Sequence, residues 1–319
     1  MKYDKIDGLN KDISKLIMGN DNQTYFDEAA KLWDHWMEVG GNAFDTAYIY
    51  GGGSMEKLLG EWHRKRDNLN DLVIVAKGAH TPNCDPASIS SQLTESLDRL
   101  QIETADIYIM HRDNKDIPVG EFVDVLNDEV NKGRIKIFGG SNWTLNRFQE
   151  ANNWADSHQK NKFSILNNNL ALSKMINPLW DGCISSNDDE ILQYLEETQT
   201  AHLSWSSQGR GYFLPDEITQ KIEDDITANE TWRKPGEHSS GPLSCFESED
   251  NRERKKRAFE LASKMNVESQ NIAGAWPINL NFPSFALIGP RISSELDSSL
   301  SNIDIEMTKD QVNWLNLKN

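Results

Sequence analysis

Residues 72–111 read LVIVAKGAHTPNCDPASISSQLTESLDRLQIETADIYIMH. An apolar, β-branched run at 72–77 is followed by an amphipathic stretch of helical length at 86–100, and then by a second apolar run at 106–111. Short apolar runs bounded by turn residues are typical of buried strands, and a helix between two such runs indicates parallel pairing. The segment therefore predicts one strand–helix–strand unit.

The same unit recurs along the chain at a spacing of about 30 residues, the usual size of such a unit. Further strands are predicted at 15–18, 43–47, 135–139, 164–167, 201–205 and 285–289. Further helices are predicted at 25–39, 55–65, 119–131, 145–155, 189–197, 293–301 and 309–317. Eight alternating units favour an α/β fold of the (β/α)8 TIM barrel type, with residues 1–319 as a single domain. An open doubly wound sheet is the main alternative, but the first strand ends in MGNDN and not in G-x-G-x-x-G.

The interval between the last two predicted strands is too long for one helix. Segment 215–250 is rich in Glu, Asp, Ser and Pro, and we expect a long loop there with a short helix over the carboxyl-end face of the barrel. A second helix is predicted to begin near NRERKKRAFELASKM. The basic run 252–257 is interpreted as a solvated helix face. Arg112 and Asp113, which lie next to each other in the chain beside His111, are interpreted as a surface ion pair and not as substrate ligands.

The chain is strongly acidic, with 50 Asp and Glu against 33 Lys and Arg among 319 residues, for a net charge of −17. Such a surface repels nucleic acids and anionic lipids, and no apolar run approaches the roughly 20 residues of a membrane span. Residues 1–16 lack the apolar core of a secretory signal, and three dispersed cysteines suit a reducing compartment and no metal site. We expect a cytoplasmic protein with a small-molecule partner, without nucleic-acid, membrane or metal binding; the sequence leaves the oligomeric state open.

Ionisable residues stand at the ends of three consecutive predicted strands. Asp45 and Tyr50 follow the second strand, Lys77 ends the third and His111 ends the fourth. Catalytic groups of barrel enzymes lie at the carboxyl ends of strands, so these four side chains are expected to converge. The Lys77 ammonium should lower the pKa of Tyr50 toward the working range, while Asp45 holds Lys77 charged and His111 donates a hydrogen bond to a substrate oxygen. The set predicts protonation of a carbonyl oxygen whose carbon accepts hydride.

Four ordered motifs resemble the aldo-keto reductase superfamily. They are FDTAYIYGGGSMEKLLGEW, VIVAKG, IYIMHRDN and GRIKIFGGSNW, and the likeness extends from KLIMGN to GPRISSELDSSL. Within the superfamily, the segments HRDN-x3-PVGEFVDVLN and SNWTLNRF are similar to the aryl-alcohol-dehydrogenase-like and potassium-channel-β-subunit-like branch. The resemblance implies a (β/α)8 barrel without a Rossmann domain, which binds NADPH or NADH in an extended pose at the barrel mouth.

The resemblance assigns catalytic and substrate roles position by position. Tyr50 matches the family's general acid, Lys77 and Asp45 match the pair that tunes its acidity, and His111 matches the residue that orients the carbonyl. Tyr50 and His111 would therefore touch the substrate. Trp143 either lines the substrate site or packs in the core.

The resemblance also implies cofactor contacts. Ser141 and Asn142 match residues that bind the nicotinamide carboxamide, and Asn167 stands where the family usually carries Gln. Trp205 takes the place of the aromatic ring, usually Tyr, that stacks under the nicotinamide. The remaining implied contacts to the dinucleotide are Gly19, Asn20, Asp45, Ser206, Gln208, Gly211, Gly289, Arg291, Glu295 and Ser299.

Together these features predict an NAD(P)-dependent oxidoreductase that reversibly reduces an aldehyde, ketone or small sugar carbonyl, with the proton coming from Tyr50. Two alternatives stay open: a cofactor-binding sensor or partner subunit of the same fold with slow turnover, and a redox enzyme acting on a carbohydrate with a bound, recycled cofactor.

The choice between NADP and NAD rests on segment 289–299. Arg291 and Ser293 suit an adenosine 2′-phosphate, whereas Glu295 stands where many relatives carry Arg or Gln and would repel it. We expect the preference for NADP to be modest or lost.

Overall fold

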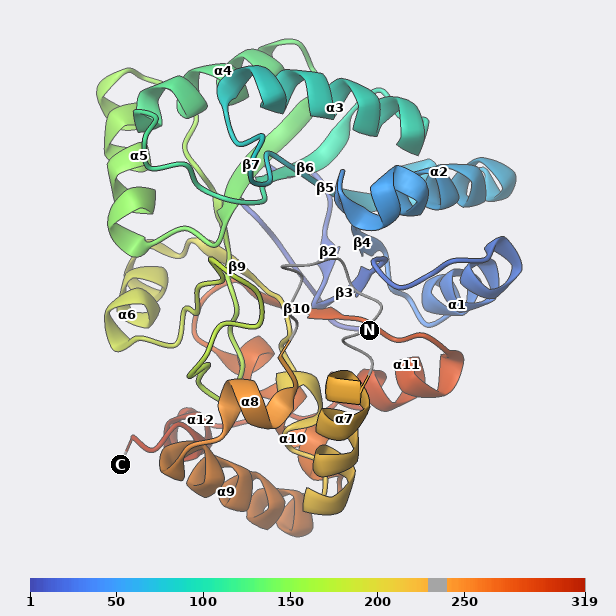
Figure 1. The fold of residues 1–319 in the computed structure, drawn as a ribbon, viewed down its shortest axis with the longest axis vertical. Helices are drawn as coiled ribbons and strands as arrows, with labels where there is room; N and C mark the ends of the chain where they lie inside the picture. Colours follow the sequence, from blue (N-terminus) through green and yellow to red (C-terminus); the bar gives the residue numbers. More distant parts are fainter. Residues whose placement is uncertain (229–239, 319) are drawn as a thin grey trace.

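The computed structural model describes residues 1–228 and 240–318. Eight parallel strands close into a barrel in the order β10-β3-β4-β5-β6-β7-β8-β9, and helices surround it (Figure 1). The barrel strands are β3 (Leu16–Gly19), β4 (Ala43–Asp45), β5 (Val73–Gly78), β6 (Ala105–Met110), β7 (Ile135–Ser141), β8 (Ile165–Asn167), β9 (Ala201–Ser204) and β10 (Ser284–Ile288). The predicted TIM barrel is confirmed, and each predicted strand overlaps an observed one.

A helix follows each of the first six barrel strands. These six are α1 (Phe26–Glu38), α2 (Ser54–Arg66), α3 (Pro86–Leu100), α4 (Val119–Asn131), α5 (Leu145–Ser157) and α6 (Asp189–Thr198). Local sequence sets where several of them begin: the Asp85 carboxylate caps α3 by accepting a hydrogen bond from the Ser88 N–H, and the Thr144 hydroxyl caps α5 in the same way. The chain ends in α11 (Ser293–Leu300) and α12 (Lys309–Leu315).

The interval between β9 and β10 is more helical than the sequence suggests. It contains α7 (Asp216–Ala228), α8 (Pro242–Phe246), α9 (Glu249–Met265) and α10 (Ser269–Ala275). In Figure 1 helices α7, α8 and α9 lie together on the side of the barrel remote from α3 and α4. The expected long loop with one short helix is wrong for its described parts, because α7 runs for 13 residues; residues 229–239 of that expectation lie outside the described residues.

The basic run at the start of α9 is also not fully solvated. Arg254 is 3% exposed and Lys255 9% exposed. The Lys255 ammonium donates a hydrogen bond of 2.6 Å to the Asp216 carboxylate on α7, and its apolar stem is thereby buried between the two helices. The expectation of a solvated helix face therefore fails on one side of α9, where a neighbouring helix supplies the partner charge.

The strands alternate between two apolar cores. In β5, the side chains of Val73 and Val75 belong to the cluster inside the barrel, whereas Ile74 and Ala76 belong to the cluster between barrel and helices. Because both faces are buried, the strand sequence is continuously apolar. Burial of each large aliphatic side chain stabilises the fold by roughly 1.5–3 kcal/mol.

A short antiparallel hairpin closes the amino end of the barrel. It consists of β1 (Tyr3–Asp4) and β2 (Ile13–Ser14), and the sequence did not predict it. Ile6, Leu9 and Ile13 join the cluster inside the barrel. The interior of the barrel is thus closed at its amino end by apolar side chains.

Membrane spans and metal clusters both bear on function. No helix among the described residues is long and apolar enough to cross a membrane. In the same residues, no group of three or more His, Cys, Asp or Glu side chains is placed to hold a metal ion. Cys84, Cys183 and Cys245 are all free thiols.

Candidate active site

At the carboxyl ends of the barrel strands, most of the expected site residues face the interior of the barrel. Successive side chains of a strand point to opposite faces, and Val75 of β5 and Ile109 of β6 lie inside the barrel. The residues two positions later, Lys77 and His111, therefore also point inward. The same alternation turns the corresponding strand-end positions inward: Gly19, Asp45, Lys77, His111, Ser141, Asn167 and Gly289. Trp205, one residue beyond the end of β9, packs against the cluster between barrel and helices.

Three of these residues, Asp45, Lys77 and His111, meet Tyr50 at the ends of β4, β5 and β6. The Lys77 ammonium donates a hydrogen bond to Asp45, and both side chains are almost fully buried. Lys77 Nζ lies 5.0 Å from the centroid of the Tyr50 ring. The ring of His111 meets that of Tyr50 edge-on, at 5.8 Å between centroids, and the ring of His80 lies 4.9 Å from that of His111. The structure brings the expected tetrad together.

The loop that carries Tyr50 is shaped by glycines and held by an arginine. Gly51, Gly52 and Gly53 have φ values of +54°, +63° and +90°, a left-handed conformation that favours glycine, and they turn the chain directly into α2. Arg99 of α3 donates a hydrogen bond of 3.2 Å to the carbonyl of Tyr48, and its guanidinium lies 4.4 Å from the Tyr48 ring centroid. Tyr50 is therefore presented by an anchored turn.

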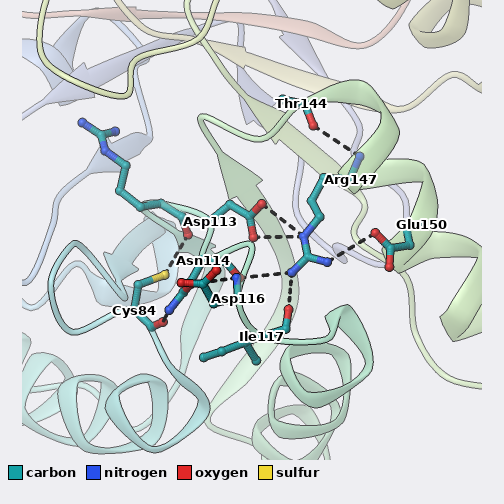
Figure 2. Close-up of polar contacts among 9 residues, drawn as sticks. Cys84, Asp113, Asn114, Asp116, Ile117, Thr144, Arg147 and Glu150 are labelled. Atoms are coloured by element: carbon teal, nitrogen blue, oxygen red, sulfur yellow. Dashed lines mark hydrogen bonds and ion pairs between the residues drawn. The ribbon is translucent and has the colours of Figure 1, made fainter.

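The loop that carries His111 is held by Arg147 of α5. Its Nε donates to both carboxylate oxygens of Asp113, at 3.2 and 3.1 Å, and its Nη2 donates to the carbonyls of Asn114 and Ile117. Figure 2 shows the Arg147 side chain between these groups and Glu150. A single buried guanidinium thus fixes the chain immediately after His111.

Arg112 is consequently not paired with Asp113, and the predicted surface ion pair between them is wrong. Arg112 Nη1 donates to the His111 carbonyl at 3.3 Å and Nη2 contacts Cys183 Sγ at 3.7 Å. Its positive charge opposes the rise in the pKa of Tyr50 and helps to lower that of His111, so it lies close to both. Sequence reasoning left Arg112 out of the site because it took Asp113 as the ion-pair partner of Arg112. In the structure Arg147, from helix α5, pairs with Asp113 instead.

The electrostatics of the tetrad differ from the expectation. Burial raises the pKa of Tyr50 well above its usual range, and the negative charges of Asp45 and Asp21 raise it further. The Lys77 ammonium does not reverse this, since Asp45 pairs with it directly. The predicted lowering of the Tyr50 pKa by Lys77 is therefore wrong.

His111 titrates in the opposite direction. Burial lowers the pKa of His111 well below its usual range, and the nearby positive charge of Lys77 lowers it further. At neutral pH the site therefore presents an uncharged imidazole and a protonated phenol. Both groups can donate a hydrogen bond to the same acceptor, and His111 Nδ1 is buried without a protein partner.

The expected carboxamide-binding residues lie at the ends of β7 and β8, where Ser141 and Asn167 are register partners. The Asn142 amide nitrogen donates to Ser141 Oγ at 3.1 Å, and its oxygen accepts from the Ile184 N–H at 3.0 Å. The Asn167 amide nitrogen donates to the Leu203 carbonyl at 2.7 Å. These side chains are buried and held in fixed orientations.

Trp205 and Trp143, the two tryptophans considered for the site, have different environments. Trp205 is half-buried beyond the end of β9, and its ring centroid lies 6.2 Å from that of Trp180. Trp143 is 0% exposed and packs on Phe163 and Phe122, at 4.8 and 6.3 Å between centroids. Trp205 has a ring available at the barrel mouth, whereas Trp143 belongs to the core. The expectation that Trp143 lines a substrate site is not met.

The loop after β9 has a backbone suited to anions. Ser206, Gly209, Arg210 and Gly211 have positive φ values of 50°, 63°, 53° and 90°. Turns in which successive backbone N–H groups face the same side form concave groups of donors that bind anions. The Ser207 hydroxyl donates to the Leu287 carbonyl at 2.8 Å and ties this loop to β10.

The segment after β10 is exposed and internally bonded. Glu295 accepts a hydrogen bond of 2.7 Å from the Arg291 N–H, and both side chains are exposed. Ser299 is buried, donates to the Glu295 carbonyl at 3.1 Å and accepts from Gln208 at 3.4 Å. The Glu295 carboxylate therefore occupies a backbone donor at the start of α11.

The beginning of the first loop completes the barrel mouth. Asn20 is fully buried; its amide nitrogen reaches the Met55 carbonyl at 3.4 Å, and its Oδ1 has no protein partner. The Asn22 amide nitrogen donates to the Gly289 carbonyl at 3.0 Å, so the loops after β3 and β10 are joined. Gly19 and Gly289 stand beside this junction, and an added Cβ at Gly19 would lie 3.1 Å from the Ile288 carbonyl oxygen.

Comparison with known proteins gives consistent matches. The family model described as the Aldo/keto reductase family matches residues 15–318. A Schizosaccharomyces pombe protein named as an aryl-alcohol dehydrogenase is 23% identical over 317 residues, covering 91% of each chain. Norsolorinic acid reductase stcV of Emericella nidulans is 23% identical over 302 residues, covering 89% of this chain and 70% of that protein. The solved structure of a thermostable aldo-keto reductase, Tm1743, with the inhibitor epalrestat superposes with a TM-score of 0.74 at 19% identity, covering 99% of both chains.

Proposed function

This chain belongs to the aldo/keto reductase family of oxidoreductases, and from that premise we propose that it reduces the carbonyl of an aldehyde, ketone or small sugar with NADH or NADPH. The observation that carries the proposal is the meeting of Tyr50 and His111 beside the buried Lys77–Asp45 pair. The reverse reaction, oxidation of an alcohol, would use the same groups.

Tyr50 is proposed as the general acid and His111 as the group that orients the carbonyl. The raised pKa of Tyr50 keeps the phenol protonated, so it is ready to donate, but only to an oxygen that has begun to gain negative charge. Neutral His111 can donate a hydrogen bond to that oxygen without competing for its proton. After transfer, the tyrosinate would lie beside Lys77, and Asp45 keeps that ammonium in place.

The residues around the mouth fit a dinucleotide. Ser141, Asn142 and Asn167 offer polar edges for a carboxamide, and Trp205 offers a partly exposed ring face for stacking. The positive-φ loop 206–211 suits a diphosphate. When bound there, the cofactor would supply the hydride.

We propose that the preference for the family's usual NADP over NAD is modest or lost. The Glu295 carboxylate already accepts the Arg291 N–H, so a backbone donor in the segment proposed for the 2′-phosphate is occupied by a negative group. Arg291 keeps some attraction for phosphate, because its exposed guanidinium is free of ion pairs with other described residues. The two effects oppose each other, so the preference is expected to be small.

A cytoplasmic location belongs to the same proposal. Three free thiols agree with a reducing compartment. The proposed partner is a small carbonyl compound, and the net charge of −17 weighs against nucleic acid.

The test is a turnover assay on the purified protein with each nicotinamide cofactor and a panel of aldehydes, ketones and small sugars, followed by nicotinamide absorbance. Steady multiple turnovers that depend on the Tyr50 hydroxyl are expected. A single stoichiometric change would instead favour the sensor or the recycled-cofactor alternative. No change with any carbonyl and either cofactor would contradict the proposal.

A further inference from the structure

Arg112 presents a positive charge beside the tetrad that no described carboxylate neutralises. Its two polar contacts are the His111 carbonyl at 3.3 Å and the Cys183 sulfur at 3.7 Å. A guanidinium has five N–H donors, so these contacts leave most of its capacity unused. The side chain is half-buried, and removing an arginine from water without a counter-charge is costly. The chain has 50 acidic and 33 basic residues, yet none of its described carboxylates pairs with this guanidinium. The guanidinium is therefore suited to an anionic group of a bound molecule.

The neighbouring carboxylate is not available to Arg112. Asp113 is engaged by Arg147 through both of its oxygens, as Figure 2 shows. The backbone of Arg112 is also fixed, because the Cys84 thiol donates to its carbonyl at 3.2 Å. The Cys84 thiol thus fixes the main chain at Arg112, while the guanidinium contacts Cys183 on the loop after β8.

The guanidinium lies on the substrate side of the barrel mouth. Its charge acts on Tyr50, His111 and His80, lowering the pKa of each group. Around the closed barrel β6, which precedes Arg112, stands opposite β10. The loops 206–211 and 289–299, which suit the cofactor phosphates, follow β9 and β10. A phosphate of the cofactor is therefore not the natural partner of Arg112.

The surroundings leave one edge of the guanidinium accessible to a small group. Gly182 is exposed and lies beside it: a Cβ added there would be 4.0 Å from Arg112 Nε. Asp21, the exposed carboxylate that acts on Tyr50 and Asp45, precedes α1 on the β3 side of the mouth and makes no ion pair with Arg112 in the described structure. An anionic group of a bound molecule is thus repelled by Asp21 on the β3 side of the mouth and attracted by Arg112 on the β6 side.

We propose that Arg112 binds the acid group of the substrate, so that the preferred substrates are aldehydes or ketones that also carry a carboxylate or a phosphate. Guanidinium pairs with either anion through two parallel hydrogen bonds. The carbonyl then lies toward Tyr50 and His111, and the acid group lies toward Cys183. This substrate class rests on the proposed carbonyl reduction at the same site.

The first experiment uses the unmodified protein and matched substrate pairs. Pentanal is compared with 5-oxopentanoate, and glyceraldehyde with glyceraldehyde 3-phosphate, by kcat/KM with the better nicotinamide cofactor. We expect the acid-bearing member of at least one pair to be favoured by about tenfold or more, the scale of one charge-assisted hydrogen bond. The two pairs separate a carboxylate ligand from a phosphate ligand.

The second experiment compares Arg112→Gln, Arg112→Lys and the control Arg64→Met. Arg64 is exposed on α2 and bonded to Gln101, away from the tetrad. Arg112→Gln should lower kcat/KM for the favoured anionic substrate about 10- to 100-fold, mainly through KM, and change that for pentanal less than threefold. Arg112→Lys should recover part of the loss, and Arg64→Met should change neither value.

The outcomes separate the two proposals. Equal kcat/KM within each pair for the unmodified protein overturns the role of Arg112 even if no variant folds, and so does an equal loss on neutral and anionic substrates in Arg112→Gln. Absence of turnover on every compound refutes carbonyl reduction itself. Turnover on neutral aldehydes without any anion preference leaves carbonyl reduction standing and rejects the acid-binding role alone.

Discussion

The corner that carries Tyr50 and the corner proposed for the adenosine end of the cofactor are built in opposite ways. At the ends of β4, β5 and β6, Asp45, Lys77 and His111 are buried and Tyr50 is half-buried. The Lys77–Asp45 pair is set by two adjacent strands. After β10, Arg291 and Glu295 are exposed and contact each other within one short segment. A change in the first corner disturbs packing, charge and chemistry at once, whereas a change in the second alters one solvated contact. The difference indicates that chemistry is rigidly specified here and cofactor preference is adjustable.

The largest expected effect tests the buried corner. Tyr50→Phe removes the proton donor without removing the ring, so turnover should fall by roughly 10²- to 10⁴-fold, the contribution of general acid catalysis. Cofactor affinity, measured by fluorescence titration, should change little. Tyr25→Phe is the control, because Tyr25 is 69% exposed; comparable rates in both variants would remove Tyr50 from the mechanism.

The pH profile tests the charges of that corner. Because the pKa of Tyr50 is raised, in part by the negative charge of Asp45, reduction by the unmodified protein should not decline up to about pH 9. Asp45→Asn removes a charge that raises this pKa and leaves Lys77 unopposed, so the decline of kcat should move to lower pH. Turnover should also fall by about tenfold or more as Lys77 loses its anchor. A profile that does not move, or moves to higher pH, would contradict this account of the Tyr50 pKa.

The pH dependence of the unfolding free energy tests the buried His202 on β9, the strand that pairs with β10. His202 on β9 is fully buried, and burial lowers its pKa to about 3. In the unfolded chain the imidazole binds its proton below about pH 6.5, but the folded protein does not until about pH 3, so acid favours unfolding across this window. At pH 5 the cost is about 2 kcal/mol from this group. His202→Gln should flatten the dependence of unfolding free energy on pH between 6.5 and 3 in urea titrations; the exposed His35, which pairs with Asp297, supplies the control His35→Gln.

The smallest expected effect is at the exposed corner itself. The unmodified protein should prefer NADP over NAD by less than about a hundredfold, or 2.7 kcal/mol. Glu295→Gln removes the carboxylate next to the site proposed for the 2′-phosphate, and NADP should then bind about fivefold tighter, the scale of an exposed charge interaction. NAD affinity should stay within about twofold. Asp297→Asn, two residues away and bonded to His35, should change neither constant; a strong NADP preference before mutation would show that Glu295 faces away from the phosphate.

Sequence reasoning succeeded where one local rule applied repeatedly. Apolar runs at regular intervals predicted all eight barrel strands, and the two-residue alternation of strand side chains placed Lys77 and His111 on the inner face. It failed where the relevant partner comes from a distant element. The hairpin β1–β2 was missed because two two-residue strands carry no periodic signal, and α7 was missed because its polar composition resembles that of a loop.

The sequence by itself therefore determined the barrel, the family resemblance and the convergence of the tetrad, because these depend on short-range alternation and on residue order along strands. Only the tertiary structure decided how the charges are shared. It paired Asp113 with Arg147 and left Arg112 without an ion pair to any described carboxylate. It also moved Trp143 into the core and set the direction of the Tyr50 pKa. Burial and ion pairing are properties of what packs around a side chain, and that packing joins residues that are far apart in the chain.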